Sequence, residues 1–366
     1  MWSKDNEDTI TDEDGNIVYF GIERFVRDIC LGDCCFICGA PRDSVPFNDE
    51  HILPQWVLGR YDLHARTINL PNGTSFRYDR YTIPCCESCN TLMGRTLEEP
   101  MRALVEGGNS AIFGHQENTG HLLFYVWVGL IFLKLHLKDR RLRANRDLRK
   151  SAATISEDLE YNWQGLHYLH TLVRCFATGT VIDPSALGSF VCIRVQEDLS
   201  AKSFDLADLY DAQAIMVRID GFAFLAAFND ARGSGLFLKQ KLDRVTGPVS
   251  SLQLRELFAE LCFLNLHLKE HPPIQSGFSL DDELHAMKGE IIVPELHELD
   301  YGVRAHLHEY YFRDQIGKIK NYQFSDAEIV AMIKSGRMTF LFDRNGRFFE
   351  TSVAEPPANF TRSEEP

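Results

Sequence analysis

Two pairs of cysteines in this sequence have the spacing of a metal-binding site. Cys35 and Cys38 form one C-x-x-C pair, and Cys86 and Cys89 form the other. This spacing lets two sulfurs from one tight turn reach the same ion at about 2.3 Å, and four thiolates complete a tetrahedral zinc site. Gly39 follows the first pair and permits an unusual turn there. We therefore predict a structural Zn²⁺ held by these four cysteines.

Neighbouring cysteines leave other arrangements open. Cys34 and Cys85 each adjoin a predicted ligand, but pairing them with Cys38 and Cys89 would give x-x-x spacings. The alternative to zinc is that the clustered cysteines are buried free thiols or a redox pair. The isolated cysteines lie in apolar surroundings and are expected to be core residues: Cys30, Cys175, Cys192 and Cys262.

An acidic residue followed by a histidine lies between the two cysteine pairs. Glu50 and His51 are followed by Pro54, and Asn90 comes directly after the last cysteine. Cleavage of a phosphodiester needs a cation on its oxygens and a base whose pKa is near neutrality. Histidine supplies such a base, with His64 as a second candidate, and oxygen ligands suit Mg²⁺ or Mn²⁺. The combination supplies the metal ligands and the base that a metal-dependent hydrolytic centre needs.

In this order of residues the sequence resembles the HNH endonuclease family, in its version with zinc-binding cysteine pairs. The resemblance covers about residues 33–102 and rests on Glu50-His51, Pro54 and Cys86-x-x-Cys89-Asn90. It implies a ββα-metal domain in which His51 is the general base and Glu50 and Asn90 bind the catalytic Mg²⁺ or Mn²⁺. It also implies an endonuclease that acts on double-stranded DNA, in a restriction or anti-phage defence setting.

The chain departs from the family pattern at one position. The family has a middle asparagine shortly before the second cysteine pair, which orients the catalytic histidine, whereas this chain has Arg80-Tyr81-Thr82 there. The candidates for this role are Asn69 or Asn72 through a longer loop, a backbone carbonyl, or Thr82. Arg80 is also a candidate for holding the scissile phosphate, because its planar guanidinium suits phosphate oxygens.

Basic residues after the cysteine-rich region are candidates for substrate binding. No lysine lies between Lys4 and Lys134, so phosphate contacts within the nuclease region must come from arginines. The basic stretch that begins at Lys134 is predicted to contact the backbone of a duplex, and its alternative is a solvated helix face that pairs with acidic patches. The predicted contacts are Arg80, Arg95, Lys138, Arg140, Arg141 and Arg143.

The helix that begins near Asn90 carries further polar residues. Arg95 is placed to meet a phosphate, while Glu98 and Glu99 are expected to be solvated or to cap the helix before Pro100 ends it. The alternative for the whole region is a non-catalytic zinc-bound adaptor that binds nucleic acid or protein. An adaptor would need the four cysteines but no catalytic histidine.

Composition restricts the classes of protein to which the chain can belong. Its 366 residues, 45% hydrophobic and 25% charged, are ordinary for a globular protein of two or three domains. A net charge of −14 excludes binding of nucleic acid by the whole surface. The apolar stretch at residues 121–137 is shorter than the about 20 residues of a bilayer span, so we interpret it as a buried helix. Without a secretory leader, and with clustered cysteines typical of metal binding, a cytoplasmic location is expected.

Hydrophobic periodicity predicts an α+β fold, and the resemblance implies that a small zinc-bound ββα-metal domain comes first, followed by a larger mixed α+β domain. Helical spacing occurs at residues 22–30, 121–137, 142–159, 164–176, 252–268 and 327–333, and strand-like runs occur at 17–20, 190–195, 215–219, 222–228 and, as a hairpin, 338–349. The predicted parts are an acidic lead-in (1–19), the nuclease domain (20–118), an α+β domain (119–353) and a disordered tail (354–366). The α+β domain would select the target, regulate the enzyme, form a homo-oligomer or dock a regulatory protein.

Overall fold

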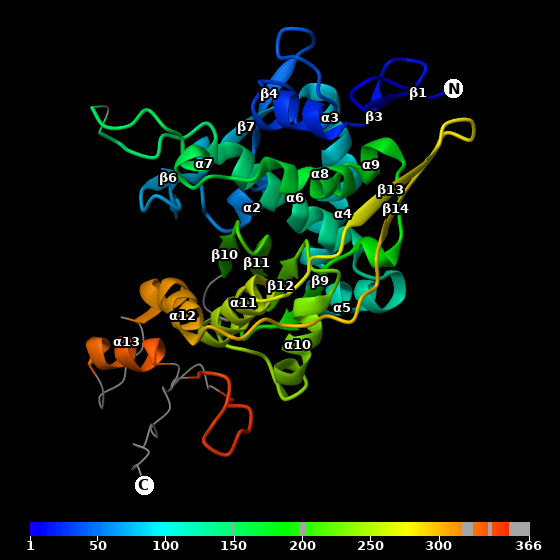
Figure 1. Cartoon of the computed structure of the whole chain (residues 1–366). Helices are drawn as coiled ribbons and strands as arrows, with labels where there is room; N and C mark the ends of the chain where they lie inside the picture. Colours follow the sequence, from blue (N-terminus) through cyan, green and yellow to red (C-terminus); the bar gives the residue numbers. More distant parts are fainter. Residues whose placement is uncertain (148, 198–202, 317–324, 336–338, 351–366) are drawn as a thin grey trace. The chain divides into compact units, whose positions relative to one another are not determined.

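The chain divides into two compact units of mixed helices and strands (Figure 1). The computed structural model describes residues 1–147, 149–197, 203–316, 325–335 and 339–350. The first unit contains Met1–Leu187 with Pro273–Glu290, and the second contains Gly188–Pro272 with Ile291–Pro366. Both units contain helices and small sheets, which confirms the predicted α+β class.

A two-stranded sheet followed by a helix forms the centre of the cysteine-rich region. Strand β4 (Phe47–His51) pairs antiparallel with β7 (Thr82–Cys86), and helix α3 (Glu87–Met93) begins at the next residue. The register places Glu50 opposite Ile83. The residues between the two strands form α2 (Gln55–Arg60), the hairpin of β5 (Thr67–Asn69) and β6 (Ser75–Arg77), and the 3-10 turn η2 (Tyr78–Arg80).

The helical stretch that starts with α3 continues past Pro100. A π-helical turn, η3 (Gly94–Glu98), joins α3 to α4 (Glu99–Glu106), and Pro100 lies in the first turn of α4. Proline is tolerated at the start of a helix, where its missing N–H would have no partner, and a π-turn interrupts the ordinary hydrogen-bond ladder. The predicted end of the helix at Pro100 is therefore wrong.

The long apolar helix α6 (Leu122–Asp139) belongs to the first unit, so the predicted boundary between residues 118 and 119 lies inside that unit. Helix α6 contacts β7, α4 and η3, and nearly all of its side chains are buried, including Trp127 and Phe132. Burial on all sides explains why the helix has no polar face. Among the described helices, none taken alone meets the length and apolarity of a membrane span; only α5 (Gly108–Thr119) and α6, bent at 110°, meet them as a pair.

The basic stretch predicted as a helix over residues 142–159 is mostly irregular. Among its described residues, only α7 (Ile155–Asp158) is helical. The side chain of Asn145 accepts a hydrogen bond from the N–H of Asp147, and the side chain of Asp147 accepts one from the N–H of Arg149. Such local side-chain bonds stabilise turns at the expense of helix, which accounts for the difference.

The other described elements of the first unit surround this region. The strand predicted at residues 17–20 is β3 (Ile17–Tyr19), so the predicted lead-in contributes a sheet, and the helix predicted at 22–30 is α1 (Ile22–Arg24) followed by the π-helical η1 (Phe25–Cys30). The remaining elements are β1 (Ser3–Lys4), β2 (Ile10–Thr11), η4 (Trp163–Leu166), α8 (His167–Val173), α9 (Cys175–Thr178), β8 (Val181–Ile182), η5 (Pro184–Ala186), β13 (Ile274–Ser279) and β14 (Leu284–Gly289).

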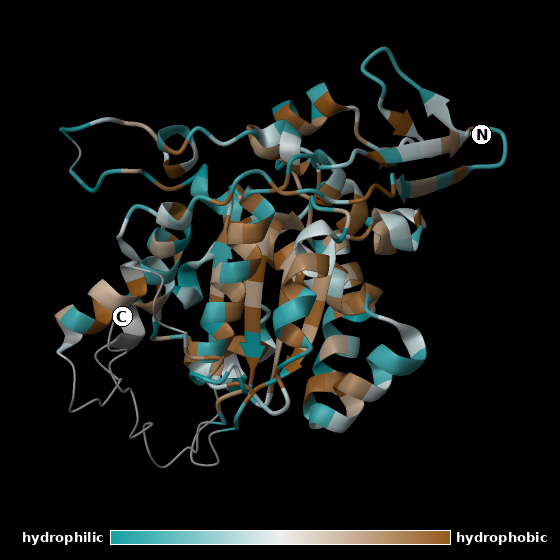
Figure 2. Ribbon diagram, turned by 60° about the horizontal axis from the view of Figure 1, so that its bottom comes forward, coloured by the Kyte–Doolittle hydropathy of each residue, from teal (hydrophilic) through white to brown (hydrophobic). Residues whose placement is uncertain are grey.

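A four-stranded antiparallel sheet in the order β10-β11-β12-β9 forms the centre of the second unit. Strands β11 (Ala214–Ile219) and β12 (Phe222–Ala227) are buried along their whole length, and Figure 2 shows apolar strands beneath the covering helices. Helix α11 (Ser251–Leu266) packs on both strands. The other elements are β9 (Ser189–Arg194), β10 (Phe204–Leu209), α10 (Gly233–Leu242), α12 (Tyr301–Ile316) and α13 (Asp326–Lys334). The strands predicted at residues 190–195, 215–219 and 222–228 and the helices at 252–268 and 327–333 are confirmed.

The hairpin predicted at residues 338–349 consists, within residues 339–350, of a turn and one bridge. The carbonyl of Asp343 accepts from the N–H of Gly346, and Phe342 pairs with Phe348 as an isolated bridge. Residue 338 and the predicted disordered tail at 354–366 lie outside the described residues.

Candidate metal centre and adjoining site

The two predicted cysteine pairs come together in the first unit. The Sγ atoms of Cys35, Cys38, Cys86 and Cys89 all lie within 4.8 Å of one another, and those of Cys38 and Cys86 are 3.6 Å apart. Thiolates bound at about 2.3 Å to a tetrahedral zinc lie about 3.8 Å apart. The cluster could therefore hold a zinc ion, and its ligand set is the predicted one.

The backbone around the first pair explains how two of the sulfurs reach one point. The N–H of Gly39 donates to the carbonyl of Cys35 at 2.8 Å, which closes a tight turn. Gly39 has a φ of +75°, and a Cβ atom there would lie 2.6 Å from the ring of Phe20. Both the backbone angle and the close ring require glycine at this position. In the second pair, Cys86 ends β7 and Cys89 lies in the first turn of α3.

The adjoining cysteines lie outside the four-sulfur cluster. Cys85 is buried with its sulfur 3.9 Å from that of Cys35, and this contact and its burial raise the pKa of the Cys85 thiol. Hydrogen bonds from Cys38, Cys85 and Cys89 hold the pKa of Cys35 well below its usual value. The x-x pairing rests on geometry, because Cys85 is not among the four cysteines whose Sγ atoms all lie within 4.8 Å of one another.

A buried arginine lies close to the cysteine cluster. Arg174, between α8 and α9, is 2% exposed, donates from Nη2 to the carbonyl of Ile17 at 2.6 Å and lies 4.6 Å from the ring centre of Phe20. Its Nε and Nη1 atoms are buried without a hydrogen-bond partner among the described residues. Burial lowers the pKa of Arg174 to about 10, while the charges of Cys38 and Cys89 act in the opposite direction. The guanidinium is therefore placed as a counter-charge to the cluster.

Glu50 forms a buried ion pair that the sequence did not indicate. Its Oε1 accepts from Nζ of Lys134 on α6 at 2.8 Å, and the side chains are 10% and 2% exposed. The same Nζ donates to the carbonyl of His51 at 2.8 Å. A lysine within an otherwise apolar helix is a signal for such a partner, because lysine is almost never fully buried unless paired.

His51 faces different neighbours. Its Nε2 lies 3.3 Å from the carbonyl of Asp79 in η2, and the amide nitrogen of Gln55 lies 2.9 Å from its Nδ1. The same Gln55 nitrogen also lies 3.1 Å from Nε2. Nδ1 therefore carries the lone pair in the tautomer in which Nε2 donates to the carbonyl. Of the candidates for orienting His51, a backbone carbonyl is the group in contact, whereas Asn72 contacts the residue 143–144 backbone. His64 reaches only Oε1 of Gln55, at 3.4 Å.

Asn90 contacts β4 through Asn48, which lies two residues before Glu50. Its Nδ2 donates to Oδ1 of Asn48 at 3.0 Å. Asn48 and Glu50 are two residues apart on β4 and so lie on the same face of the strand, opposite to His51. Within the described residues, no hydrogen bond joins the side chains of Glu50, His51 and Asn90 to one another. Glu50 and His51 lie on β4, whereas Asn90 lies on α3 and is bonded to β4 through Asn48.

A further carboxyl group lies near the ion pair. Glu98 of η3 is half-buried, and this burial raises its pKa to about 7; the positive charge of Lys134 opposes the shift and the negative charge of Glu50 adds to it. The sequence predicted that Glu98 is solvated or caps the helix; it is half-buried and stands at the N-cap position of α4, without a side-chain cap hydrogen bond. The π-turn accounts for the burial of Glu98. Its hydrogen bonds differ from those of an α-helix, so different side chains of η3 point toward the interior of the protein.

Three of the six predicted phosphate contacts bind other parts of the protein. Lys138 donates to the carbonyl of Thr82 at 2.7 Å, and burial lowers its pKa. Arg140 donates to the carbonyl of Gly32 at 3.3 Å. Arg141 pairs with Asp33 at 2.7 Å. These side chains attach the end of α6 to β7 and to the loop before the first cysteine pair.

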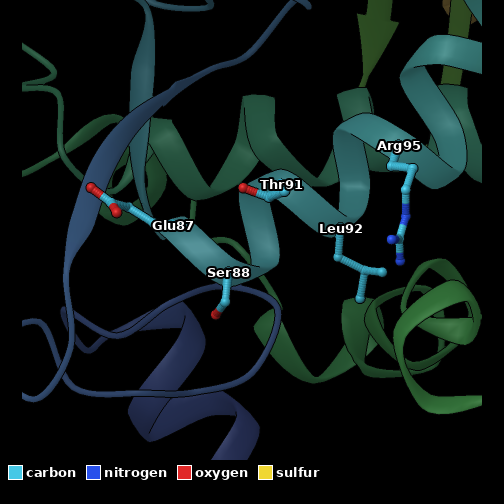
Figure 3. A pocket seen from close by; sticks show the side chains of 5 residues that line it. All are labelled: Glu87, Ser88, Thr91, Leu92 and Arg95. Atoms are coloured by element: carbon cyan, nitrogen blue, oxygen red, sulfur yellow. The ribbon is translucent and has the colours of Figure 1, made fainter.

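Arg80, Arg95 and Arg143 have exposed side chains, and none of them forms an ion pair within the described residues. Arg80 ends η2, next to the carbonyl of Asp79 that His51 contacts. Arg95 lies at one end of a pocket along α3, with Glu87 at the other end (Figure 3). The pocket is lined by Glu87, Ser88, Thr91, Leu92 and Arg95.

Comparisons with family models, with curated proteins and with solved structures found no match for this chain.

Replacing Cys89 with serine is expected to remove bound zinc, because serine is not a thiolate ligand. Wild type should contain about one zinc per chain by elemental analysis, since the described residues form one four-sulfur cluster. Cys175→Ser, which changes a cysteine of the same unit outside the cluster, should keep it. A zinc-free wild type, or equal zinc in both variants, would contradict the assignment.

Replacing Arg174 with methionine is expected to weaken zinc binding by about 10-fold or more, because it removes a buried cation beside the cluster. The measurement is competition with a chelator of known zinc affinity. Arg174→Lys, which keeps the charge, should retain most of the affinity. Equal affinity in folded wild type and Arg174→Met would show that the arginine has only a packing role.

Replacing Lys134 with methionine is expected to lower the free energy of unfolding by about 3–5 kcal/mol, because Glu50 would remain buried without a partner. The measurement is urea-induced unfolding. The double variant Lys134→Met/Glu50→Gln should recover part of the loss, since no charge is then buried. A single variant as stable as wild type would contradict the importance of this pair.

Proposed function

We propose that the chain is a metal-dependent endonuclease that hydrolyses phosphodiester bonds of DNA, with an HNH-like centre on β4, β7 and α3. The observation that carries the proposal is the position of His51, which ends β4 with its Nε2 toward the carbonyl of Asp79. The four-cysteine cluster lies at the other end of the same ribbon, where β7 meets α3.

In this proposal His51 is the general base. The bond from Nε2 to the carbonyl of Asp79 fixes the ring and leaves the lone pair of Nδ1 to accept a proton from water. Gln55 donates to Nδ1 at 2.9 Å, so the attacking water would displace this amide or bind beside it. The Asp79 carbonyl takes the role that a middle asparagine has in the family.

Glu50 and Asn90 supply oxygen ligands that fit Mg²⁺ or Mn²⁺. Lys134 holds Oε1 of Glu50, whereas no hydrogen bond engages Oε2 of Glu50 or Oδ1 of Asn90 among the described residues. A bound divalent ion would neutralise charge on the phosphate and its leaving oxygen. Lys134 would keep the carboxylate fixed in one orientation.

A non-catalytic zinc-bound adaptor is the second candidate, and one observation favours it. The ion pair with Lys134 already neutralises the buried carboxylate of Glu50. In an adaptor this pair would only stabilise the ribbon, and His51 would have no part in the function.

Replacing His51 with alanine is expected to lower the rate of plasmid cleavage by about 100-fold or more, since a general base contributes about that factor. The full chain would be assayed with Mg²⁺ and with Mn²⁺. The matched control is His64→Ala, which changes a nearby histidine that contacts only Gln55 and should stay active.

The two candidate functions give different results in this assay. Cleavage that is absent from wild type, or equal in wild type and His51→Ala, would contradict the nuclease. If the chain is an adaptor, the His51→Ala variant should still bind the partner and the Cys86→Ser variant should not. Only the second change removes a predicted zinc ligand.

A further inference from the structure

An exposed group of basic residues extends from the neighbourhood of His51 along the β5–β6 hairpin. We define the arginine surface as Arg66, Arg80, Arg143, Arg146 and Lys150, all of which have exposed side chains. We propose that this surface binds the phosphate backbone of duplex DNA beside the cleavage site. The inference rests on the proposed nuclease function and names the surface that would hold its substrate.

Two segments that are distant in sequence are joined to form this surface. The side-chain amide of Asn72, at the tip of the β5–β6 hairpin, donates to the carbonyls of Arg143 and Ala144, both at 3.1 Å. Arg146 donates to the carbonyl of Ser75 at 3.2 Å. The arginines after α6 are therefore held against the hairpin that leads to η2.

The arginine surface forms no ion pair among the described residues, although the charge of Arg80 helps to lower the pKa of Asp79. Arg77 pairs with Asp79 and Arg149 pairs with Asp147, so these two nearby arginines are already occupied. No residue of the arginine surface forms an ion pair within the described ranges, which leaves its charges for an external anion. Arginine is well suited to phosphate because its planar group donates two parallel hydrogen bonds.

The hairpin is fixed to the residues around His51. The ring centre of Phe76 lies 5.6 Å from that of Tyr81, and Nζ of Lys138 lies 5.6 Å from the same Phe76 ring. Arg80 directly follows Asp79, whose carbonyl contacts His51. A nucleic acid backbone on the arginine surface would therefore lead to the proposed base.

The surface suits a duplex better than a single strand. Proteins that bind single strands stack bases on exposed aromatic rings. The aromatic residues of the hairpin, Phe76 and Tyr78, are half-buried, and among the described residues no exposed aromatic ring comes from either segment. Contacts to phosphates alone do not require unpaired bases.

The test is binding of the full chain to a labelled DNA duplex, measured by fluorescence anisotropy with Ca²⁺ in place of Mg²⁺ to separate binding from cleavage. Arg143→Ala/Arg146→Ala is expected to raise Kd about 10-fold and to reduce the slope of log Kd against log salt by about 2, one for each lost phosphate contact. The charge-matched control is Lys4→Ala/Arg102→Ala, since both residues are exposed and paired with nearby acids. Its Kd should stay within about twofold of wild type.

Three results would overturn the proposal: equal weakening by both double variants, no weakening by Arg143→Ala/Arg146→Ala, or tighter binding of single-stranded DNA or duplex RNA than of duplex DNA. The nuclease proposal fails separately. Duplex binding that depends on Arg143 and Arg146, without cleavage in Mg²⁺ or Mn²⁺, would support the arginine surface and contradict the nuclease. Conversely, if Arg143→Ala/Arg146→Ala binds duplex DNA as tightly as wild type and still cleaves it, the result would support the nuclease and contradict the arginine surface.

Discussion

The four-cysteine cluster is the constraint on which the candidate site depends. It joins the turn that contains Cys38 to Cys86, 48 residues later, at the junction of β7 and α3. A two-stranded ribbon is marginally stable alone, and a helix of seven residues is shorter than the about 12–15 that an isolated helix needs. A metal ion in the cluster would hold the turn, the ribbon and the helix together. The positions of His51 and Asn90 follow from that arrangement.

Buried charge extends this constraint to the rest of the first unit. Four thiolates and one Zn²⁺ carry a net charge of −2, and burial of such a charge is unfavourable without a nearby cation. Arg174 lies beside the cluster, and Lys134 neutralises Glu50. Both cations come from helical segments beyond residues 33–102. Residues 33–102 are therefore not an independent module, because a truncation that removed α6 would remove both the partner of Glu50 and a helix that packs against β7.

Local features of the site could be predicted from the sequence, whereas its long-range contacts could not. The spacing within each C-x-x-C pair is a property of one turn, so the four ligands were found from the sequence. The periodicity of α6 indicated a buried helix but not which side chain its Lys134 would meet, because that depends on a contact across 84 residues. Residues 142–159 have the composition of a helix, yet Asn145 and Asp147 form turns there.

In the proposal above, the arginine surface would allow a protein with a net charge of −14 to bind a polyanion. At physiological ionic strength exposed charges are screened beyond about 8 Å, so acidic residues elsewhere on the chain have little effect on a phosphate bound at Arg143 or Arg146. What matters is that these side chains form no ion pair within the part of the chain that the structure describes. The ion pairs of Arg77 and Arg149 show the contrast, since each is neutralised by an aspartate two residues away. The unneutralised side chains, rather than the total number of basic residues after α6, are the ones that can attract DNA.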